Sequence, residues 1–134
     1  MIRYLDELRD LDLPEDAYAV FGSGPLAIRG IRENHDLDVI VTPDLWRELG
    51  RKHAVTTKSG RPDTIHIGPI QILQAGYRDF RPFLDDNLVL IREAEIIDGV
   101  PFVRLEHLLG CKKMMKGEKH ERDVASMLEY LDGS

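Results

Sequence analysis

The chain has little cysteine and no long apolar run. Its 134 residues include a single cysteine, Cys111, which excludes an intrachain disulfide framework and a cysteine-rich zinc site. The apolar runs reach about five residues, far short of the roughly 20 that a membrane-spanning helix needs. The first ten residues, MIRYLDELRD, carry acidic side chains where a signal peptide requires an apolar stretch. These absences predict a soluble, cytoplasmic protein with no membrane contact.

Basic residues are also in the minority. There are 18 lysines and arginines against 24 acidic residues, which gives a formal net charge of −6. A protein that coats nucleic acid needs a broad basic face, so this balance argues against that class. The five histidines show no zinc-type spacing. A local basic patch remains compatible with the composition.

What the chain does have is enough apolar material for one core. Its hydrophobic content of 43% and its length are typical of a single domain spanning residues 1–134. No internal repeat or low-complexity segment interrupts it. Helical and strand patterns alternate along the chain, which predicts an α/β or α+β fold with a mixed sheet, flanking helices and two C-terminal helices.

Periodicity and turn residues locate the elements. Thr42 is expected to cap a helix that begins at Pro43, and Asp98-Gly99 is expected to form the turn of a hairpin within 95–103. The other expected helices lie at 3–13, 25–30, 104–115 and 121–131. The other expected strands lie at 17–21, 36–41, 54–57, 64–67 and 70–73.

Two acids open one of these strands. Asp36 and Asp38 are two residues apart, so on a strand they project from the same face, roughly 6.6 Å apart. Two such carboxylates repel each other unless a cation lies between them. Hard divalent cations such as magnesium prefer oxygen ligands. The pattern therefore predicts a metal-binding pair whose strand is anchored by its opposite face.

A glycine-serine turn precedes this pair. Gly22 and Ser23 end one expected strand and lead into a helix at Pro25. Backbone N–H groups at such a turn bind anions, glycine permits close approach of a phosphate, and the serine hydroxyl can donate to it. The strand-helix-strand path can bring Ser23 near Asp38. Phosphates and metal would then meet at one end of the sheet, as phosphoryl transfer requires.

Together the two motifs resemble a known signature. VFGS, followed after 12 residues by DLDV, is similar to the signature of the nucleotidyltransferase superfamily related to DNA polymerase beta. The chain is about as long as the minimal members of this superfamily. Residues 22–41 resemble its uncharacterised and toxin–antitoxin-associated branches. The C-terminal stretch resembles the closing helices of these proteins. In those helices a lysine is followed by a basic turn with a glycine and by an aspartate that begins the last helix. The matching residues here are Lys112 or Lys113, Gly117 and Asp123.

The resemblance implies a role for each matched residue. Asp36 and Asp38 would bind magnesium, or manganese in its place, and act in catalysis, while Gly22 and Ser23 would contact the phosphates of a nucleoside triphosphate such as ATP. A third carboxylate normally comes from a later central strand. The corresponding stretch here holds Gln71, a neutral amide that cannot accept a proton. Asp63 and His66 are candidates to replace it.

Other polar residues have two interpretations each. Arg29 and Arg32 could reach a triphosphate or pair with nearby acids. The same alternatives apply to a basic group that includes Lys113 and that could contact phosphate or form a solvated helix face. The remaining members of that group are Lys112, Lys116, Lys119 and Arg122. The aromatics Tyr77, Phe80 and Phe83, beside Arg78 and Arg81, could stack a base or anchor a loop.

The expected function is magnesium-dependent transfer of a nucleoside monophosphate to a hydroxyl. The acceptor, whether protein, RNA or small molecule, stays open. Asp36 and Asp38 would hold the metal, Gly22 and Ser23 the phosphates, and Arg29 or Lys113 would neutralise charge. The alternative is a catalytically inactive module of the same fold that binds a nucleotide or a partner protein. A second copy of the chain is a further candidate partner.

Overall fold

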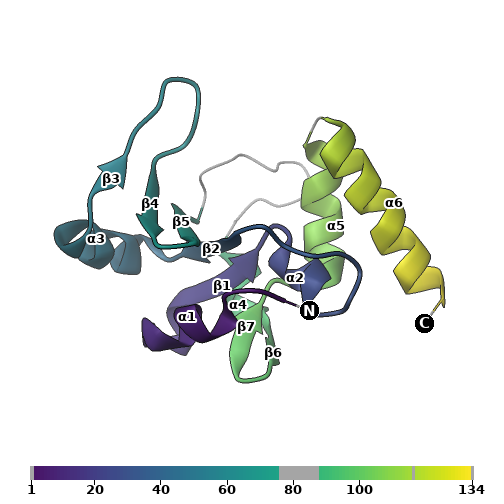
Figure 1. Ribbon diagram of the computed structural model, residues 1–134, viewed down its shortest axis with the longest axis horizontal. Helices are drawn as coiled ribbons and strands as arrows, with labels where there is room; N and C mark the ends of the chain where they lie inside the picture. Colours follow the sequence, from purple (N-terminus) through teal and green to yellow (C-terminus); the bar gives the residue numbers. More distant parts are fainter. Residues whose placement is uncertain (1, 76–87, 116, 134) are drawn as a thin grey trace.

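The computed structural model describes residues 2–75, 88–115 and 117–133. In this part of the chain one mixed sheet of seven strands carries helices on both faces (Figure 1). The fold class expected from the sequence, a mixed α/β (α+β) arrangement, is confirmed. The strands are β1 (Tyr18–Phe21), β2 (Leu37–Val41), β3 (Val55–Thr56), β4 (Thr64–Ile67), β5 (Ile70–Gln74), β6 (Glu95–Ile97) and β7 (Val100–Phe102).

The expected helices appear in the predicted order, including the two at the C-terminal end, and the structure adds α4 (Val89–Arg92), which the sequence did not predict. None of those in the described ranges is long and apolar enough to cross a membrane. They are α1 (Leu5–Asp10), α2 (Gly24–Ala27), α3 (Pro43–Lys52), α4 (Val89–Arg92), α5 (Leu105–Met114) and α6 (Glu118–Gly133), with a 3-10 turn at Glu15–Ala17.

Local signals explain where several elements begin and turn. The Thr42 hydroxyl accepts a hydrogen bond from the backbone N–H of Leu45 at 3.3 Å, so Thr42 caps α3 as expected, with Pro43 in its first turn. Asp98 and Gly99 have φ values of 52° and 76°. Both central residues of a type I′ turn have positive φ, so this pair connects β6 and β7 as predicted.

Two expected helices are shorter than their patterns. The helix expected over 3–13 is limited to α1 because Tyr4 (φ 72°) and Asp12 (φ 51°) adopt left-handed backbone conformations that a helix cannot include. The helix expected over 25–30 ends at Ala27. The aromatic and arginine residues Tyr77, Arg78, Phe80, Arg81 and Phe83 lie outside the described residues, as does Lys116.

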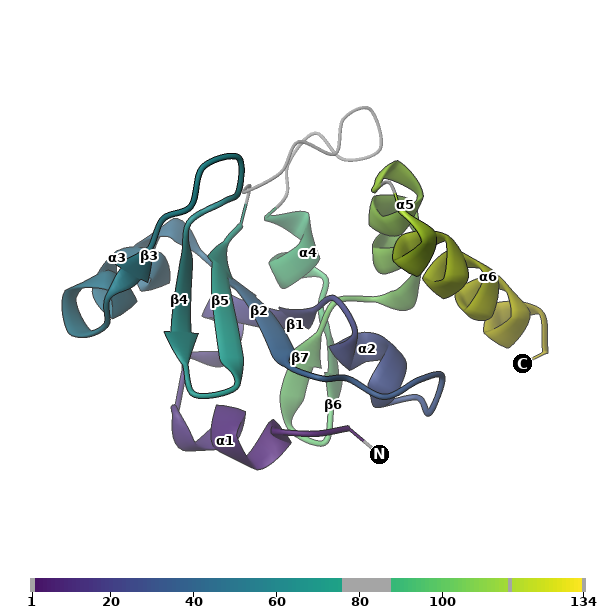
Figure 2. The ribbon, with the colours of Figure 1, turned by 45° about the horizontal axis from the view of Figure 1, so that its top comes forward.

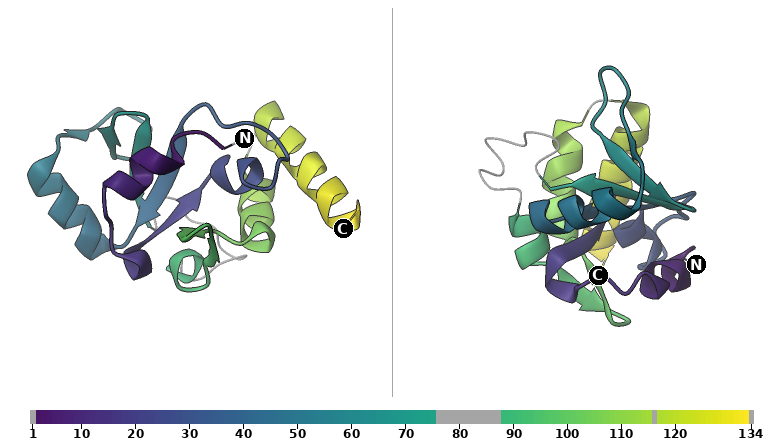
Figure 3. Two further views of the ribbon diagram at one scale, coloured as in Figure 1. Left: turned by 60° about the horizontal axis from the view of Figure 1, so that its bottom comes forward. Right: turned by 90° about the vertical axis from the view of Figure 1, so that its left-hand side faces the viewer.

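The sheet order is β3-β4-β5-β2-β1-β7-β6. The central strands β1 and β2 are antiparallel to each other, while β2 pairs in parallel with β5 and β1 in parallel with β7. The hairpins β3–β4–β5 and β6–β7 extend the sheet on its two sides. Strand β3 lies at one edge of the sheet and β6 at the other. Helix α3 lies at one end of the molecule and α5 and α6 lie together at the other (Figure 3).

Each face of the sheet covers its own apolar core. One core joins the sheet to α1 through Leu8 and to α3 through Leu45 and Leu49. The opposite core joins it to α2, α4, α5 and α6, and it contains the fully buried Cys111 and Met127. Because alternate residues of a strand point to opposite faces, Val39 enters the first core and Ile40 the second. Side chains at Asp38 and Ile40 therefore share the face that α5 and α6 cover.

Candidate functional site

Asp38 occupies the centre of the sheet. It is the second residue of β2, beside Phe21 of β1 and Gln71 of β5 in the strand register. Its Oδ1 atom is buried and has no hydrogen-bond partner among the residues that the structure describes. A buried polar atom without a partner is costly, and such atoms are rare in folded proteins. This oxygen therefore marks the place where a cation or a hydrogen-bond donor would stabilise the fold.

The electrostatic surroundings of Asp38 have the same implication. Burial and, to a smaller extent, the negative charge of Asp36 raise the pKa of this carboxyl from 3.8 to about 6, whereas the charges of Lys119 and Lys112 act in the opposite direction. A cation held against the carboxylate would remove both the burial penalty and the repulsion. The charges of Asp36, Lys112 and Lys119 thus all act on the Asp38 carboxyl.

Gly22 lies against the Asp38 carboxylate. A Cβ atom at this glycine would lie 2.8 Å from Asp38 Oδ2, and the backbone has φ +67°. Only glycine adopts that conformation without strain and leaves the carboxylate room. The glycine predicted for close approach to a ligand is therefore also required for the approach of Asp38. The turn after β1 and the acid on β2 form one site.

Ser23 is buried beside this turn. Its carbonyl oxygen accepts the backbone N–H groups of Leu26 and Ala27 at 3.1 and 2.9 Å, which begins α2. Its hydroxyl makes no cap hydrogen bond to the helix. The next residue, Gly24, allows α2 to pack on β1, because a Cβ there would lie 2.3 Å from a methyl of Val20. The hydroxyl of Ser23 is thus held near the turn without a role in capping.

Asp36 does not lie on the strand. The expectation that both acids project from one strand is wrong here, because β2 begins at Leu37 and Asp36 is an exposed residue of the preceding bend. Its carbonyl oxygen accepts a hydrogen bond at 3.0 Å from the fully buried side chain of Asn34. Asn34 also bonds both backbone groups of Arg3. The sequence alone did not identify this positioning residue.

Arg32, in the loop that leads to Asp36, forms an ion cluster with Lys112 of α5 and Asp123 of α6. Lys112 Nζ donates to Asp123 Oδ2 at 2.8 Å, and Arg32 donates through Nε and Nη2 to the two carboxylate oxygens at 2.6 and 3.0 Å. Burial alone would raise the pKa of Asp123, but the hydrogen bonds from Arg32 and Lys112 outweigh it and hold the pKa below 3.8. The cluster joins α5 and α6 to the loop after α2.

The structure separates the basic residues that the sequence left as alternatives. Arg29 pairs with the Glu95 carboxylate on β6 and donates to the carbonyl oxygen of Pro25 at 2.8 Å. Lys113 is exposed, whereas its neighbour Lys112 is buried. It is Lys112 and Lys119 whose charges lower the pKa of Asp38. Phosphate contact by Arg29 and Lys113 stays a prediction, and within the same basic group Lys112 and Lys119 are the members whose charges act on Asp38.

No third carboxylate completes the site within the described ranges. Gln71 stands at the position beside Asp38, and His66 of β4 pairs with Gln71 in turn. Asp63 is exposed before β4. Residues 2–75, 88–115 and 117–133 contain no group of three or more His, Cys, Asp or Glu side chains able to hold a metal. The residues at hand are two carboxylates, one of them with an unpartnered buried oxygen, and that set fits a divalent cation that keeps several waters.

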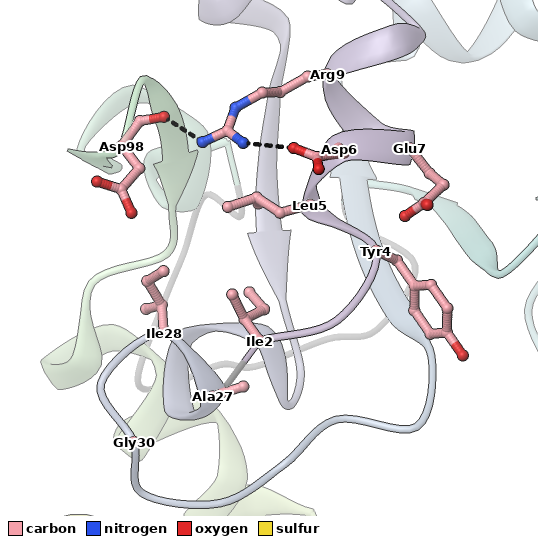
Figure 4. A pocket seen from close by; sticks show the side chains of 10 residues that line it. All are labelled: Ile2, Tyr4, Leu5, Asp6, Glu7, Arg9, Ala27, Ile28, Gly30 and Asp98. Carbon is pink, nitrogen blue, oxygen red and sulfur yellow. Dashed lines mark hydrogen bonds and ion pairs between the residues drawn. The ribbon is translucent and has the colours of Figure 1, made fainter.

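A separate cavity of about 600 Å³ lies between α1, α2 and the β6–β7 turn. In Figure 4, Ile2, Leu5 and Ile28 project into it and Arg9 crosses its rim. Arg9 already donates to the Asp98 carbonyl oxygen at 2.7 Å and to Asp6 at 3.0 Å. With carboxylates as its other charged groups, this cavity repels phosphate and does not extend the candidate site. Its remaining lining residues are Tyr4, Glu7, Ala27 and Gly30.

No family model matches the chain, and no curated protein matches it. The function is therefore inferred from the geometry around Asp38.

Proposed function

We propose that the protein is a nucleotidyltransferase-like domain that binds a nucleoside triphosphate with magnesium or manganese. It would transfer the nucleoside monophosphate to a hydroxyl acceptor. The observation that supports this best is the buried, unpartnered Oδ1 of Asp38 next to the close approach of Gly22. The turn proposed to bind phosphate, Gly22-Ser23, therefore lies against the carboxylate proposed to bind the cation, Asp38.

Each residue has a part in this proposal. Asp38 and Asp36 hold the cation, which when bound neutralises phosphate charge and orients the triphosphate. Gly22 leaves room for a phosphate oxygen and Ser23 offers its hydroxyl. Lys112 and Lys119 add positive charge on the α5–α6 side. The acceptor oxygen forms a bond to the α-phosphorus, the bond to pyrophosphate breaks, and the hydroxyl proton passes to solvent.

The first test is turnover. Purified protein is incubated with each of the four triphosphates, magnesium and a panel of protein, RNA and small-molecule acceptors, and pyrophosphate release is measured. Release should depend on magnesium and be lost in Asp38→Asn, whereas Asp132→Asn, an exposed change at the end of α6, should retain it. Absence of release with every triphosphate and acceptor would count against an active transferase.

A specific observation favours a second candidate function, a non-catalytic module of the same kind. Gln71 pairs with Asp38 where a third carboxylate is expected, and an amide supplies neither a base nor a strong metal ligand. Such a module would bind a nucleotide or a partner protein, for example in a toxin–antitoxin pair or in a homodimer.

Thermal melting with magnesium and each nucleotide separates these cases. A ligand that binds only the folded state must raise its stability. A shift in melting temperature without pyrophosphate release supports the binding module. Absence of a shift with every nucleotide supports a role in protein interaction alone.

A further inference from the structure

A second pocket, of about 200 Å³, lies on the β3–β4–β5 hairpins. Figure 2 shows these strands at one end of the molecule, with α5 and α6 at the other end. Its polar lining consists of Thr56, Lys58, Arg61, Thr64, His66 and Gln71. Neither the nucleotide site proposed above nor the ion cluster of Asp123 includes it.

The connection between β3 and β4 brings the two cations of this pocket together. The backbone N–H of Arg61 donates to the carbonyl oxygen of Lys58 at 3.1 Å. Gly60, with φ +75°, supplies the left-handed residue between them. On the strands, Thr64 Oγ1 lies 3.1 Å from Nε2 of His66, which orients the ring. Sequence positions three apart thus present a lysine and an arginine to one small space.

The charge of the pocket is opposite to that of the protein. The chain carries a formal net charge of −6, yet no aspartate or glutamate is among the lining residues of this pocket. Within the described part of the chain, neither Lys58 nor Arg61 forms an ion pair. Arginine, lysine and hydroxyl groups together are the usual donors to phosphate oxygens.

The size of the pocket limits what it can hold. Pockets for drug-sized ligands occupy about 300–1,000 Å³, so 200 Å³ suits a phosphate ester group better than a whole nucleotide. An isolated phosphate group on a larger molecule would enter it, with the rest of that molecule outside.

The position of the pocket relates it to Asp38. In the sheet order β4-β5-β2-β1, His66 pairs with Gln71 and Gln71 with Asp38, so His66 lies about 10 Å from Asp38 on the same face. Gly22 and Ser23 follow β1, on the other side of Asp38. A triphosphate at the glycine turn and a group in this pocket would therefore approach Asp38 from opposite sides.

From this arrangement we infer that the pocket binds a phosphate group of the acceptor, so the acceptor is a phosphorylated molecule with a free hydroxyl. The identification of this molecule as the acceptor rests on the proposed transferase function. Binding of phosphate itself does not depend on that function, because the pocket contains neither Asp38 nor Asp36.

The test begins without metal. Inorganic phosphate, ribose 5-phosphate and a dinucleoside monophosphate, which has a diester and no terminal phosphate, are titrated into the wild-type protein, and amide shifts are followed by NMR. The ester that the pocket accepts should move the signals of residues 56–71. Its Kd should rise at least about tenfold in K58Q/R61Q, which removes two charged donors. The exposed pair R51Q/K52Q at the end of α3 is the matched control and should bind like wild type.

Further arms separate this inference from the proposed function. Asp38→Asn should bind the ester normally, and a magnesium-bound, non-hydrolysable triphosphate should leave ester binding in place. Displacement of the ester by the triphosphate would assign the pocket to the triphosphate and overturn the acceptor role. Failure of the wild type to bind any of the probes, or equal binding by K58Q/R61Q, would overturn the phosphate site itself. If the triphosphate does not bind while the ester does, the proposed function and the acceptor role fall and the phosphate site stands.

Discussion

Gln71 lies directly beside Asp38, its register partner on the parallel strand β5. The pair places a neutral amide next to a carboxylate whose pKa is raised to about 6 by burial and by Asp36. A second charge at residue 71 would face Asp38 across neighbouring strands, whose backbones lie roughly 4.8 Å apart. This position therefore controls how much negative charge the site can carry without a cation.

Replacement of Gln71 by glutamate should convert the site into a stronger metal site. The added carboxylate supplies a third oxygen ligand, so magnesium affinity should rise by about tenfold. Without metal the new charge repels Asp38, so the free energy of unfolding should fall above pH 6. Isothermal titration with magnesium and urea unfolding measure the two effects. Gln74→Glu on the same strand, at a position that faces the other side of the sheet, should change neither magnesium affinity nor its pH dependence.

Asp38 itself should make the metal-free protein less stable as pH rises. Its pKa is raised in the folded state, so the folded protein holds the proton more tightly than the unfolded chain. The contribution is fully present below the unfolded value of 3.8 and is lost as pH rises through about 6, a change of up to about 3 kcal/mol. Asp38→Asn should remove this loss, so at pH 7.5 the metal-free variant should be at least as stable as wild type.

Urea unfolding between pH 4 and pH 8, with and without magnesium, checks this. Magnesium should stabilise the wild type above pH 6 and leave Asp38→Asn unaffected. A wild-type profile identical to that of Asp38→Asn would contradict the assignment of a buried, protonatable carboxyl.

Gly22→Ala should disturb both the backbone and the carboxylate. The left-handed conformation costs a non-glycine residue about 1–2 kcal/mol, and the new Cβ would meet Asp38 Oδ2 at 2.8 Å. Gly30→Ala is the matched control, because Gly30 has φ +75° and nothing within 4 Å of its Cβ position. Both variants should lose stability, but only Gly22→Ala should also weaken magnesium-dependent stabilisation. Equal magnesium responses in the two variants would show that the approach of Gly22 to Asp38 has no bearing on the metal site.

Asp123→Asn should be strongly destabilising. Asp123 forms ion pairs with both Lys112 and Arg32, and its carboxylate is buried; removal of one partner from such a cluster costs about 3–5 kcal/mol. Because the pKa of Asp123 is lowered in the folded state, its contribution is present above 3.8 and is lost as pH falls through the folded value. Glu129→Gln, an exposed change on the same helix, should stay within about 0.5 kcal/mol of wild type. Urea unfolding at pH 7 and below pH 3.8 distinguishes Asp123→Asn from Glu129→Gln. A small loss of unfolding free energy in Asp123→Asn at pH 7 would contradict the role of the cluster.

Much of the fold follows from local sequence signals. Thr42-Pro43 begins α3 and Asp98-Gly99 forms the last hairpin turn because capping and turn chemistry depend on adjacent residues. Helix lengths were less accurate at the N-terminal end. There Tyr4 and Asp12 take left-handed conformations that the apolar spacing does not reveal.

The candidate site was partly accessible in the same way. Gly22, Ser23 and Asp38 were found by their types and spacing, and the structure brings Gly22 against Asp38. The spacing placed Asp36 on the strand, where it is not, and it left Lys112 and Lys113 as alternatives. Burial distinguishes these lysines, because only Lys112 reaches Asp123.

By itself, then, the sequence determined the order of the strands and of every helix except α4, the turns at Gly22-Ser23 and Asp98-Gly99, and the residues of the acid pair, since these depend on short-range patterns. Only the tertiary structure decided that Gln71 stands beside Asp38, that Asp123 joins Lys112 to Arg32, and that Lys58 and Arg61 share a pocket with His66. The first two relations come from strand register and helix packing between segments distant in the chain, and the third comes from the fold of the β3–β4 hairpin. Apolar contacts over the whole core select that register, and no local pattern encodes it.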